Sequence, residues 1–289
     1  MSDSAAFRPA AGAAPGRIGQ KFRSLGEAGE LGIVAYITAG DPTLAATEKI
    51  VLAAAEAGAD VVELGVPFSD PVADGPTIQR ASERALRSGT TLAGVIELVR
   101  RIRRHLQAPL VLFSYFNPIL QMGLGNFAKQ AAEAGADGVL ATDLTPEEAG
   151  EYRGILRGNG LDTIFLAAPT STDARLKEIS AASSGFLYLV SRMGVTGARE
   201  ALPEDLPALA RRVRRFTPLP VAVGFGISQP SHVTLLGGIA DAAVVGSALM
   251  AEIEKSKSVD EAVESVAALV RRLKRAARSG ISRRGNPDE

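Results

Sequence analysis

Two carboxylates on either side of a Pro- and Gly-rich loop are the residues of this sequence best suited to proton transfer. Glu63 lies inside the apolar run Val61–Gly65, and Asp74 follows in a loop that ends at Gly75 and Pro76. Side chains alternate between the two faces of a strand, so Glu63 would have apolar neighbours. Burial without a partner raises the pKa of a carboxyl group, whereas we expect Asp74 to stay more solvated and ionised. Two carboxyl groups in unlike environments are typical of an acid and base pair.

The same two residues also allow a purely structural interpretation. Glu63 would then cap a neighbouring helix or pair with a buried arginine, and Asp74 would cap the helix expected to begin near Thr77. The sequence of this stretch alone leaves both interpretations open.

Eight apolar segments of strand length alternate with helical patterns along the chain. The apolar character is continuous rather than alternating, which is typical of parallel strands covered on both faces. Strands are predicted at residues 32–39, 61–65, 110–115, 138–141, 163–167, 185–190, 220–224 and 242–246. Helices are predicted at 18–29, 43–57, 77–88, 92–105, 127–134, 146–156, 171–181, 206–216, 229–237 and 259–278.

A recurring string supports this count of units. Residues 56–62 and 133–139 are nearly identical, and residues 238–244 form a looser third copy. Each copy is a helix end with Gly, a turn of small residues and an Asp before the next strand. Eight units with right-handed crossovers predict an α/β fold, a (β/α)8 TIM barrel. An open doubly wound sheet is the alternative.

The barrel is expected to be a single domain over residues 18–279, with an extra N-terminal helix before its first strand. Residues 1–17 are rich in Ala, Gly and Pro and are expected to be a disordered tail, and residues 280–289 a C-terminal tail.

Composition excludes several classes of function. Lys and Arg together number 32, as do Asp and Glu, so no net charge attracts nucleic acid or an anionic membrane. The chain has no cysteine, which excludes disulfides and thiolate catalysis and fits a cytoplasmic protein. His105 and His232 are isolated, so no metal site is expected. No apolar run approaches the roughly 20 residues of a membrane helix.

Glycines follow the last three predicted strands, where the site of such a barrel would lie. Glycines flank residues 191–197, as a closing lid would need. Residues 224–228 carry a Gly-x-Gly, and Gly246-Ser247 is expected to open a short phosphate-binding helix through Met250. Bare amides at these positions suit an anion such as phosphate. Glycines also serve tight turns, so the turn interpretation stays open.

Taken together, these motifs resemble the tryptophan synthase α subunit family. The resemblance covers about residues 18–278 in order, and it is carried by residues 36–42, 63–79, 188 with 191–197, 224–228 and 245–248. It departs from the family pattern at Asp143-Leu144-Thr145-Pro146, where the proline comes one residue later than usual.

The resemblance implies a lyase of tryptophan biosynthesis that cleaves indole-3-glycerol phosphate, by a retro-aldol reaction, to indole and glyceraldehyde 3-phosphate. Glu63 would be the principal acid and base, and Asp74 would accept the indole N–H. Tyr188 would support the catalytic site. Phe225, Tyr36 and Tyr115 would lie in or near the indole pocket, the amides of Gly197, Gly226, Gly246 and Ser247 would hold the phosphate, and Thr196 would contact Asp74 as the lid closes.

The resemblance also implies a partner. Family members form an α₂β₂ heterotetramer whose β subunit carries pyridoxal phosphate and receives the indole, so no cofactor is expected in this chain. The loop from Pro67 to Asp74 would lie near the contact surface. A free-standing lyase, a catalytically silent binding subunit and a different phosphate-binding barrel remain as alternatives.

Overall fold

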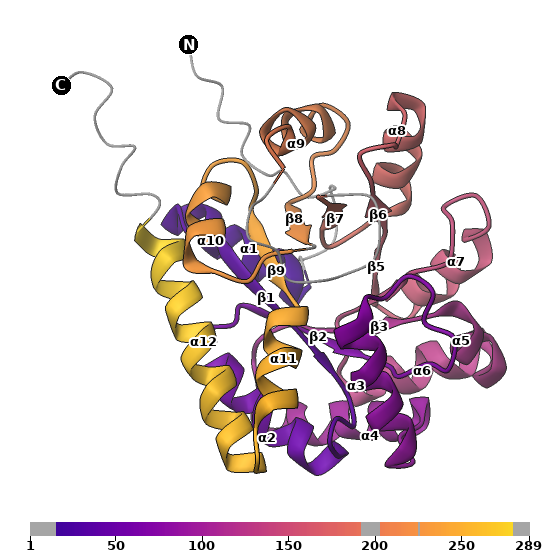
Figure 1. Cartoon of the computed structure of the whole chain (residues 1–289). Coiled ribbons are helices and arrows are strands. Elements are labelled where there is room, and N and C mark those ends of the chain that lie inside the picture. Colours follow the sequence, from indigo (N-terminus) through magenta and orange to yellow (C-terminus); the bar gives the residue numbers. More distant parts are fainter. Residues whose placement is uncertain (1–15, 192–202, 225, 280–289) are drawn as a thin grey trace.

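The computed structural model describes residues 16–191, 203–224 and 226–279. The strands of these ranges form one parallel sheet with the order β5-β4-β3-β2-β1-β9-β8-β7-β6. Helices surround this sheet (Figure 1). The strands are β1 (Gly32–Thr38), β2 (Val61–Gly65), β3 (Leu110–Ser114), β4 (Gly138–Ala141), β5 (Asp162–Ile164), β6 (Leu166–Ala167), β7 (Leu187–Val190), β8 (Val221–Gly224) and β9 (Ala242–Val245).

The two outer strands of this order are halves of the predicted fifth strand, interrupted at Phe165. β5 pairs with β4, and β6 pairs with β7. At the interruption, the carbonyl oxygen of Phe165 still accepts a hydrogen bond of 3.2 Å from the amide of Tyr188. The sheet therefore closes through a single broken strand, which confirms the predicted TIM barrel and excludes the open sheet.

The helices follow the strands as predicted, with three differences. They are α1 (Arg17–Ala28), α2 (Leu44–Glu56), α3 (Pro76–Arg87), α4 (Leu92–Arg103), α5 (Phe116–Met122), α6 (Leu124–Ala134), α7 (Gly150–Gly158), α8 (Asp173–Ala182), α9 (Leu206–Arg214), α10 (Pro230–Leu236), α11 (Ser247–Lys255) and α12 (Val259–Ser279). α1 is the extra N-terminal helix. The tails predicted at residues 1–17 and 280–289 lie outside the described residues except for Gly16 and Arg17.

The differences have local causes. α5 lies in a stretch where no helix was predicted, and its Pro118 stands in the first turn, where a proline gives up no intrahelical hydrogen bond. α7 begins at Gly150 rather than at Pro146, after a turn in which Thr145 donates to Glu148. α11 continues to Lys255, five residues beyond the predicted end at Met250.

Threonine side chains cap three of the helices at their N-termini. The hydroxyls of Thr43, Thr91 and Thr172 accept hydrogen bonds of 3.1–3.2 Å from the amide three residues later. Each cap satisfies one of the free N–H groups of the first turn. α8, predicted to begin at residue 171, has Thr172 as its N-cap.

The repeated string of the sequence provides an Asp that links neighbouring strands at their N-terminal ends. Asp60, Asp137 and Asp241 each use Oδ2 to accept the amide N–H at the start of a neighbouring strand, at 2.9, 2.8 and 2.7 Å. Each carboxylate also pairs with a cation, which is Lys274, Arg103 or Arg214 at 2.8, 2.6 or 2.8 Å. Ion pairs at this end of a barrel, opposite the expected site, serve the stability of the fold.

Replacing Asp137 by Asn is expected to destabilise the barrel by about 3 kcal/mol. The Asp137 side chain is only 5% exposed and Arg103 only 13%, so the change leaves a buried guanidinium without its counter-charge. Urea unfolding measures the loss, and turnover of the folded variant should stay within about twofold because the site lies at the other end. Glu97→Gln, which breaks an exposed pair on α4, is the control. Equal unfolding midpoints for the two variants would contradict this prediction.

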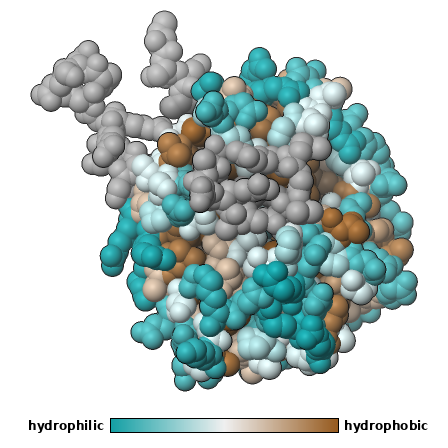
Figure 2. All heavy atoms as spheres, viewed as in Figure 1, coloured by the Kyte–Doolittle hydropathy of each residue, from teal (hydrophilic) through white to brown (hydrophobic). Residues whose placement is uncertain are grey.

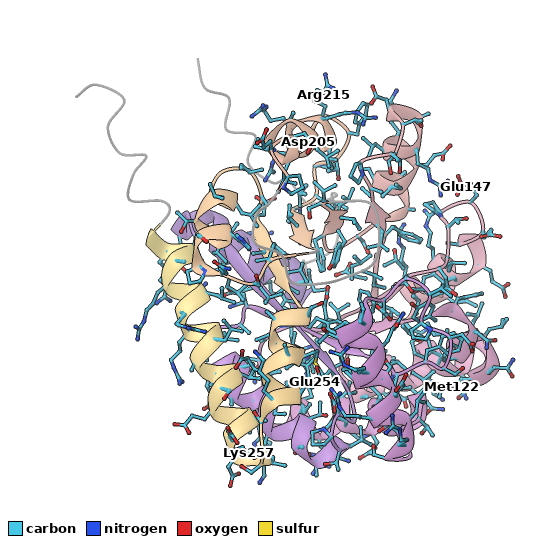
Figure 3. All side chains as sticks on the ribbon, in the orientation of Figure 1. Met122, Glu147, Asp205, Arg215, Glu254 and Lys257 are labelled. Atoms are coloured by element: carbon cyan, nitrogen blue, oxygen red, sulfur yellow. The ribbon has the colours of Figure 1, made fainter. Side chains whose placement is uncertain are left out.

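Polar and charged side chains lie on the outer helices and loops. Figure 2 shows hydrophilic residues over most of the visible face, with small separate apolar patches. Glu147, Asp205, Arg215 and Lys257 lie at the periphery in Figure 3 and are exposed. Among the described residues, no helix is both long and apolar enough to cross a membrane.

Candidate active site

Strand register places Glu63 and two tyrosines on the inner face of the barrel. Glu63 is the register partner of Tyr36 on the adjacent strand β1, so both side chains point the same way. Tyr188 is the partner of Ala222, Ala222 is the partner of Ala242, and Ala242 is the partner of Gly32. Gly32 and Tyr36 are an even number of residues apart, so Tyr188 shares the face of Tyr36 and Glu63.

Glu63 is a fully buried carboxyl group that makes no hydrogen bond within the described part of the chain. Its side chain is 0% exposed, and neither Oε1 nor Oε2 has a partner. Burial raises the pKa of Glu63 from 4.5 to about 8. The group is therefore mostly protonated at neutral pH and is able to donate a proton.

Asp74 is also buried, which corrects the expectation that it stays solvated. Only 6% of it is exposed, and burial raises its pKa from 3.8 to about 6. The Tyr115 hydroxyl donates a hydrogen bond of 3.2 Å to Asp74 Oδ2, which opposes the effect of burial. The expected order of the two groups holds, because at pH 7 Asp74 is mainly ionised and Glu63 mainly protonated.

Neither structural interpretation of these carboxylates agrees with the geometry. The N-cap of α3 is Gly75 rather than Asp74, and the Asp74 side chain accepts no capping hydrogen bond from the described part of that helix. Asp74 meets α3 instead through its backbone oxygen, which accepts a hydrogen bond of 2.9 Å from Gln79 Nε2. Because Glu63 pairs with no arginine and caps no helix in the described ranges, its burial has no structural compensation.

Two strand glycines provide the space that the inner tyrosines occupy. A Cβ atom on Gly65 would lie 2.2 Å from Tyr36 Oη, and one on Gly224 would lie 2.2 Å from Tyr188 Oη. These glycines are therefore required by a close approach of rigid rings rather than by a turn. Burial is the main cause that raises the pKa of both phenols, and negative charge on Asp74 or Glu63 would raise the pKa of each further.

Aromatic rings extend the site on the side of strands β2 and β3. The edge of Phe113 meets Tyr36 with ring centroids 5.2 Å apart, and Phe68 stacks on Tyr115 at 4.9 Å. The Ala73 amide donates to the Tyr115 hydroxyl at 2.9 Å, which holds the loop before Asp74 in place. Sequence reasoning missed Phe113 and Phe68. Phe113 is the register partner of Gly65, which shares a strand face with Glu63, so the alternation of side chains along β3 would have indicated it.

The predicted phosphate-binding residues are described only in part. Gly226 has φ +92°, a conformation that side chains rarely adopt, and Gly246 is the N-cap of α11, whose first residue is Ser247. The N-cap Gly246 has no side chain to accept a capping hydrogen bond, so a bound anion would suit the free N–H groups of the first turn. Thr196, Gly197 and Phe225 lie outside the described residues, as does most of the predicted lid at 191–197.

A separate cavity, the two histidines and the possible metal ligands give no second candidate for the active site within the described residues. A cavity of about 600 Å³ is lined by α1, the end of α2 and residues 105–109, which precede strands β2 and β3 and so lie at the opposite end of the barrel. His105 lines that cavity, and buried His232 accepts a hydrogen bond of 3.3 Å from the Ser228 amide. Within the described ranges, no three His, Asp or Glu side chains gather as metal ligands would.

Sequence comparison places this geometry among known proteins. Residues 22–278 match the family model described as tryptophan synthase alpha chain. The chain is 51% identical over 264 residues to the tryptophan synthase alpha chain of Citrifermentans bemidjiense, covering 91% of this chain and 98% of the relative. It is 50% identical over 259 residues to that of Solibacter usitatus, covering 90% and 97%.

Solved structures have the same fold. A chain of Mycobacterium tuberculosis tryptophan synthase superposes with a TM-score of 0.85 at 35% identity, covering 92% of this chain and 99% of that chain. Tryptophan synthase subunit alpha from Legionella pneumophila superposes with a TM-score of 0.82 at 36% identity, covering 91% and 99%.

Proposed function

The chain belongs to the tryptophan synthase alpha chain family, and from this premise we propose how its residues carry out the reaction of that family. The protein is a lyase of tryptophan biosynthesis that cleaves indole-3-glycerol phosphate to indole and glyceraldehyde 3-phosphate. Bond cleavage of this kind adds one proton to the indole ring carbon that bears the side chain. It removes one proton from the glycerol hydroxyl next to the broken bond.

We propose that Glu63 donates the proton to the ring carbon and accepts the proton of the glycerol hydroxyl. Its buried carboxyl group, with a pKa of about 8, is protonated in the resting protein and donates to the ring carbon. The resulting carboxylate then helps to remove the hydroxyl proton as the carbon–carbon bond breaks and the bonding electron pair moves into the indole ring. Glu63 ends the reaction as it began, protonated, so the proton count balances without another acid. Its unpaired burial is the single observation that carries this assignment.

Asp74 is proposed to hold the indole N–H. Protonation at the ring carbon places positive charge on the indole nitrogen, and an ionised carboxylate stabilises that charge most where water is excluded. Asp74 is buried, ionised above a pKa of about 6, and oriented by Tyr115, which fits this role.

The tyrosines and glycines complete the proposed site. Tyr188 supports Glu63 from the inner face, and Tyr36 and Tyr115 line the indole pocket. The amides of Gly226, Gly246 and Ser247 would hold the phosphate, because the N-terminus of α11 offers free N–H groups and a favourable dipole. Gly197, Thr196 and Phe225 remain predictions for the phosphate site, the lid and the indole pocket.

The proposed partner is a tryptophan synthase β subunit in an α₂β₂ heterotetramer. Structural relatives include chains described as parts of M. tuberculosis tryptophan synthase, among them an aminoacrylate-bound form. We propose that pyridoxal phosphate is bound only by the β subunit, and that the complex is cytoplasmic. The loop before Asp74 suits a contact surface, because Val72 is apolar and 80% exposed. The Thr145-Pro146 departure would alter contact detail rather than chemistry.

Indole formation from indole-3-glycerol phosphate tests the proposed function directly. The purified chain is assayed alone and with a β subunit, and we expect indole in both cases and a faster reaction in the complex. A rate unchanged by the partner would favour a free-standing lyase. No indole under either condition would favour a silent binding subunit or another phosphate-binding barrel.

A further inference from the structure

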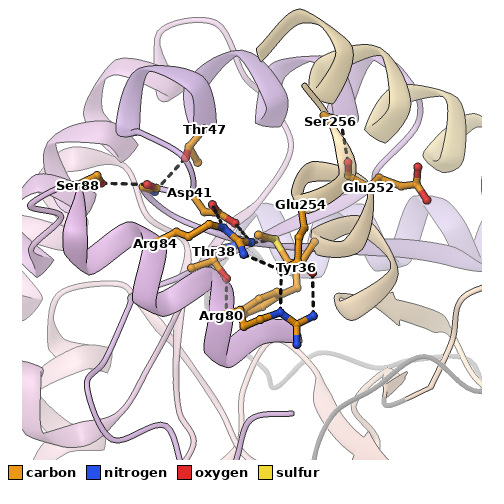
Figure 4. A network of polar contacts seen from close by, with 12 residues as sticks. Tyr36, Thr38, Asp41, Thr47, Arg80, Arg84, Ser88, Glu252, Glu254 and Ser256 are labelled. Carbon is orange, nitrogen blue, oxygen red and sulfur yellow. Dashed lines mark hydrogen bonds and ion pairs between the residues drawn. The ribbon is translucent and has the colours of Figure 1, made fainter. Parts of the chain in front are cut away.

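Two arginines of α3 connect the βα segments that follow three different strands (Figure 4). Arg84 lies between Asp41, in the segment after β1, and Glu254, in the last turn of α11 after β9. It donates to Asp41 from Nε and Nη2, each at 2.8 Å, and to Glu254 from Nη1 at 2.8 Å. Arg80, one turn earlier, donates to Glu254 from Nε at 2.7 Å and from Nη2 at 2.8 Å.

The contact between Arg84 and Asp41 is the rigid part of this network. Asp41 is 1% exposed, and Arg84 is its only ion-pair partner among the described residues. A two-pronged guanidinium contact fixes orientation as well as distance. The Arg80 side chain is 50% exposed, so its ion pair with Glu254 stabilises the network less than the pair between Arg84 and Asp41 does.

The two helices that the network joins, α3 and α11, each begin at the proposed site. α3 begins two residues after Asp74, and Gln79 of its first turn holds the Asp74 backbone oxygen. α11 begins at Ser247, where the proposed phosphate amides lie, and it is nine residues long, or about 13 Å. A carboxylate near a helix C-terminus opposes the helix dipole unless it is neutralised, and the two arginines neutralise Glu254.

We propose that Arg84 is a positioning residue that fixes the phosphate-binding end of α11 relative to the Asp74 loop. It holds α11 through Glu254 and is itself held by buried Asp41. Met250 ties the middle of the same helix to β1, since its sulfur accepts the Thr38 amide at 3.3 Å. With Glu254 released, α11 would pivot about that contact and its N-terminal amides would move. This inference rests on the proposed function, because it assumes that these amides bind the substrate phosphate.

The experiment compares Arg84→Gln and Glu254→Gln with the unchanged chain. Glu254→Gln removes the charge that both arginines hold, and it should raise the KM for indole-3-glycerol phosphate and the inhibition constant of inorganic phosphate by the same factor, about fivefold. Arg84→Gln leaves the contact between Arg80 and Glu254 and should raise both constants by a smaller common factor. The value of kcat should stay within about twofold, because the phosphate is held equally in the ground and transition states. In the double variant, the increase in KM and in the inhibition constant should be less than the product of the two single increases. Both substitutions break the same contact between Arg84 and Glu254.

Arg87→Gln is the matched control. Arg87 also lies on α3 and pairs with Glu83, but both side chains are exposed and the pair does not leave the helix. It should leave KM and phosphate inhibition unchanged. Glu254→Gln keeps the buried Arg84–Asp41 pair intact, so it decides the question even if Arg84→Gln does not fold.

The outcomes separate this inference from the proposed function. If the unchanged chain forms no indole, the proposed function is wrong. If it forms indole and Glu254→Gln changes neither KM nor phosphate inhibition, only the positioning role is overturned, and a lowered unfolding midpoint would then assign the network to stability alone.

Discussion

We expect Glu63→Gln to lower the turnover of indole-3-glycerol phosphate by at least ~10³-fold, the scale on which a positioned acid or base contributes. Glutamine keeps the shape of the side chain but has no proton to donate and no carboxylate to receive one. Steady-state indole formation at pH 7 measures the loss. Near-normal turnover would show that another group carries the proton.

The stability of the same variant separates lost chemistry from lost structure. The pKa of Glu63 is about 8 in the folded protein, against the ordinary value of 4.5 for a glutamate, so the folded state binds the proton more tightly. Its contribution to stability is present below pH 4.5 and is lost as pH rises to about 8, by up to about 1.4 kcal/mol per pH unit. Glu63→Gln should abolish this part of the slope in urea unfolding measured at several pH values.

Glu97→Gln is the control for this pair of measurements. The substitution is chemically the same, but Glu97 is exposed on α4 and pairs, among the described residues, only with Arg100. Both turnover and the pH slope of stability should remain those of the unchanged protein.

Asp74→Asn is expected to lower turnover by about 10²–10³-fold, the cost of removing one charge-stabilising group from a water-excluded site. Asparagine still accepts the Tyr115 hydrogen bond, so the loop keeps its main contact while the negative charge facing the indole nitrogen is lost. Single-turnover indole formation measures the chemical step directly. An undiminished rate would remove Asp74 from the reaction.

The pH dependence of kcat/KM should report both carboxyl groups. Activity requires Asp74 ionised, above its pKa of about 6, and Glu63 protonated, below its pKa of about 8, so the profile is bell-shaped with its maximum between them. In Asp74→Asn the acidic limb should disappear while the alkaline limb stays. Asp70→Asn, an exposed residue of the same loop, should keep the full bell and normal turnover in the isolated chain.

Local patterns were sufficient for much of the architecture. Continuous apolar runs predicted the strands, and the repeated Gly and Asp joints predicted the barrel, because both depend on residues close in sequence. The joint also has a long-range function that the repeat does not reveal. The Asp137 carboxylate accepts the amide of Leu110, 27 residues away.

The failures have an equally physical origin. No helix was predicted at α5, because seven residues are too short a stretch for a helical period to stand out. Asp74 was expected to be solvated because it lies in a loop, but it is buried and accepts a hydrogen bond from Tyr115, 41 residues later in the chain. Loop position predicts a turn, whereas burial depends on what the rest of the chain places over it.

The sequence by itself determined the barrel, the place of Glu63 within a buried strand and the presence of a second carboxylate, because apolar runs and turn chemistry are local. Only the tertiary structure decided that the Glu63 carboxyl group has no hydrogen-bond partner among the described residues, that Asp74 is buried against Tyr115, and that Gly65 and Gly224 make room for Tyr36 and Tyr188. It also brought Asp41, Arg84 and Glu254 together from three distant segments. The pKa values follow from these long-range contacts, since desolvation is a property of the closed barrel and not of any single stretch.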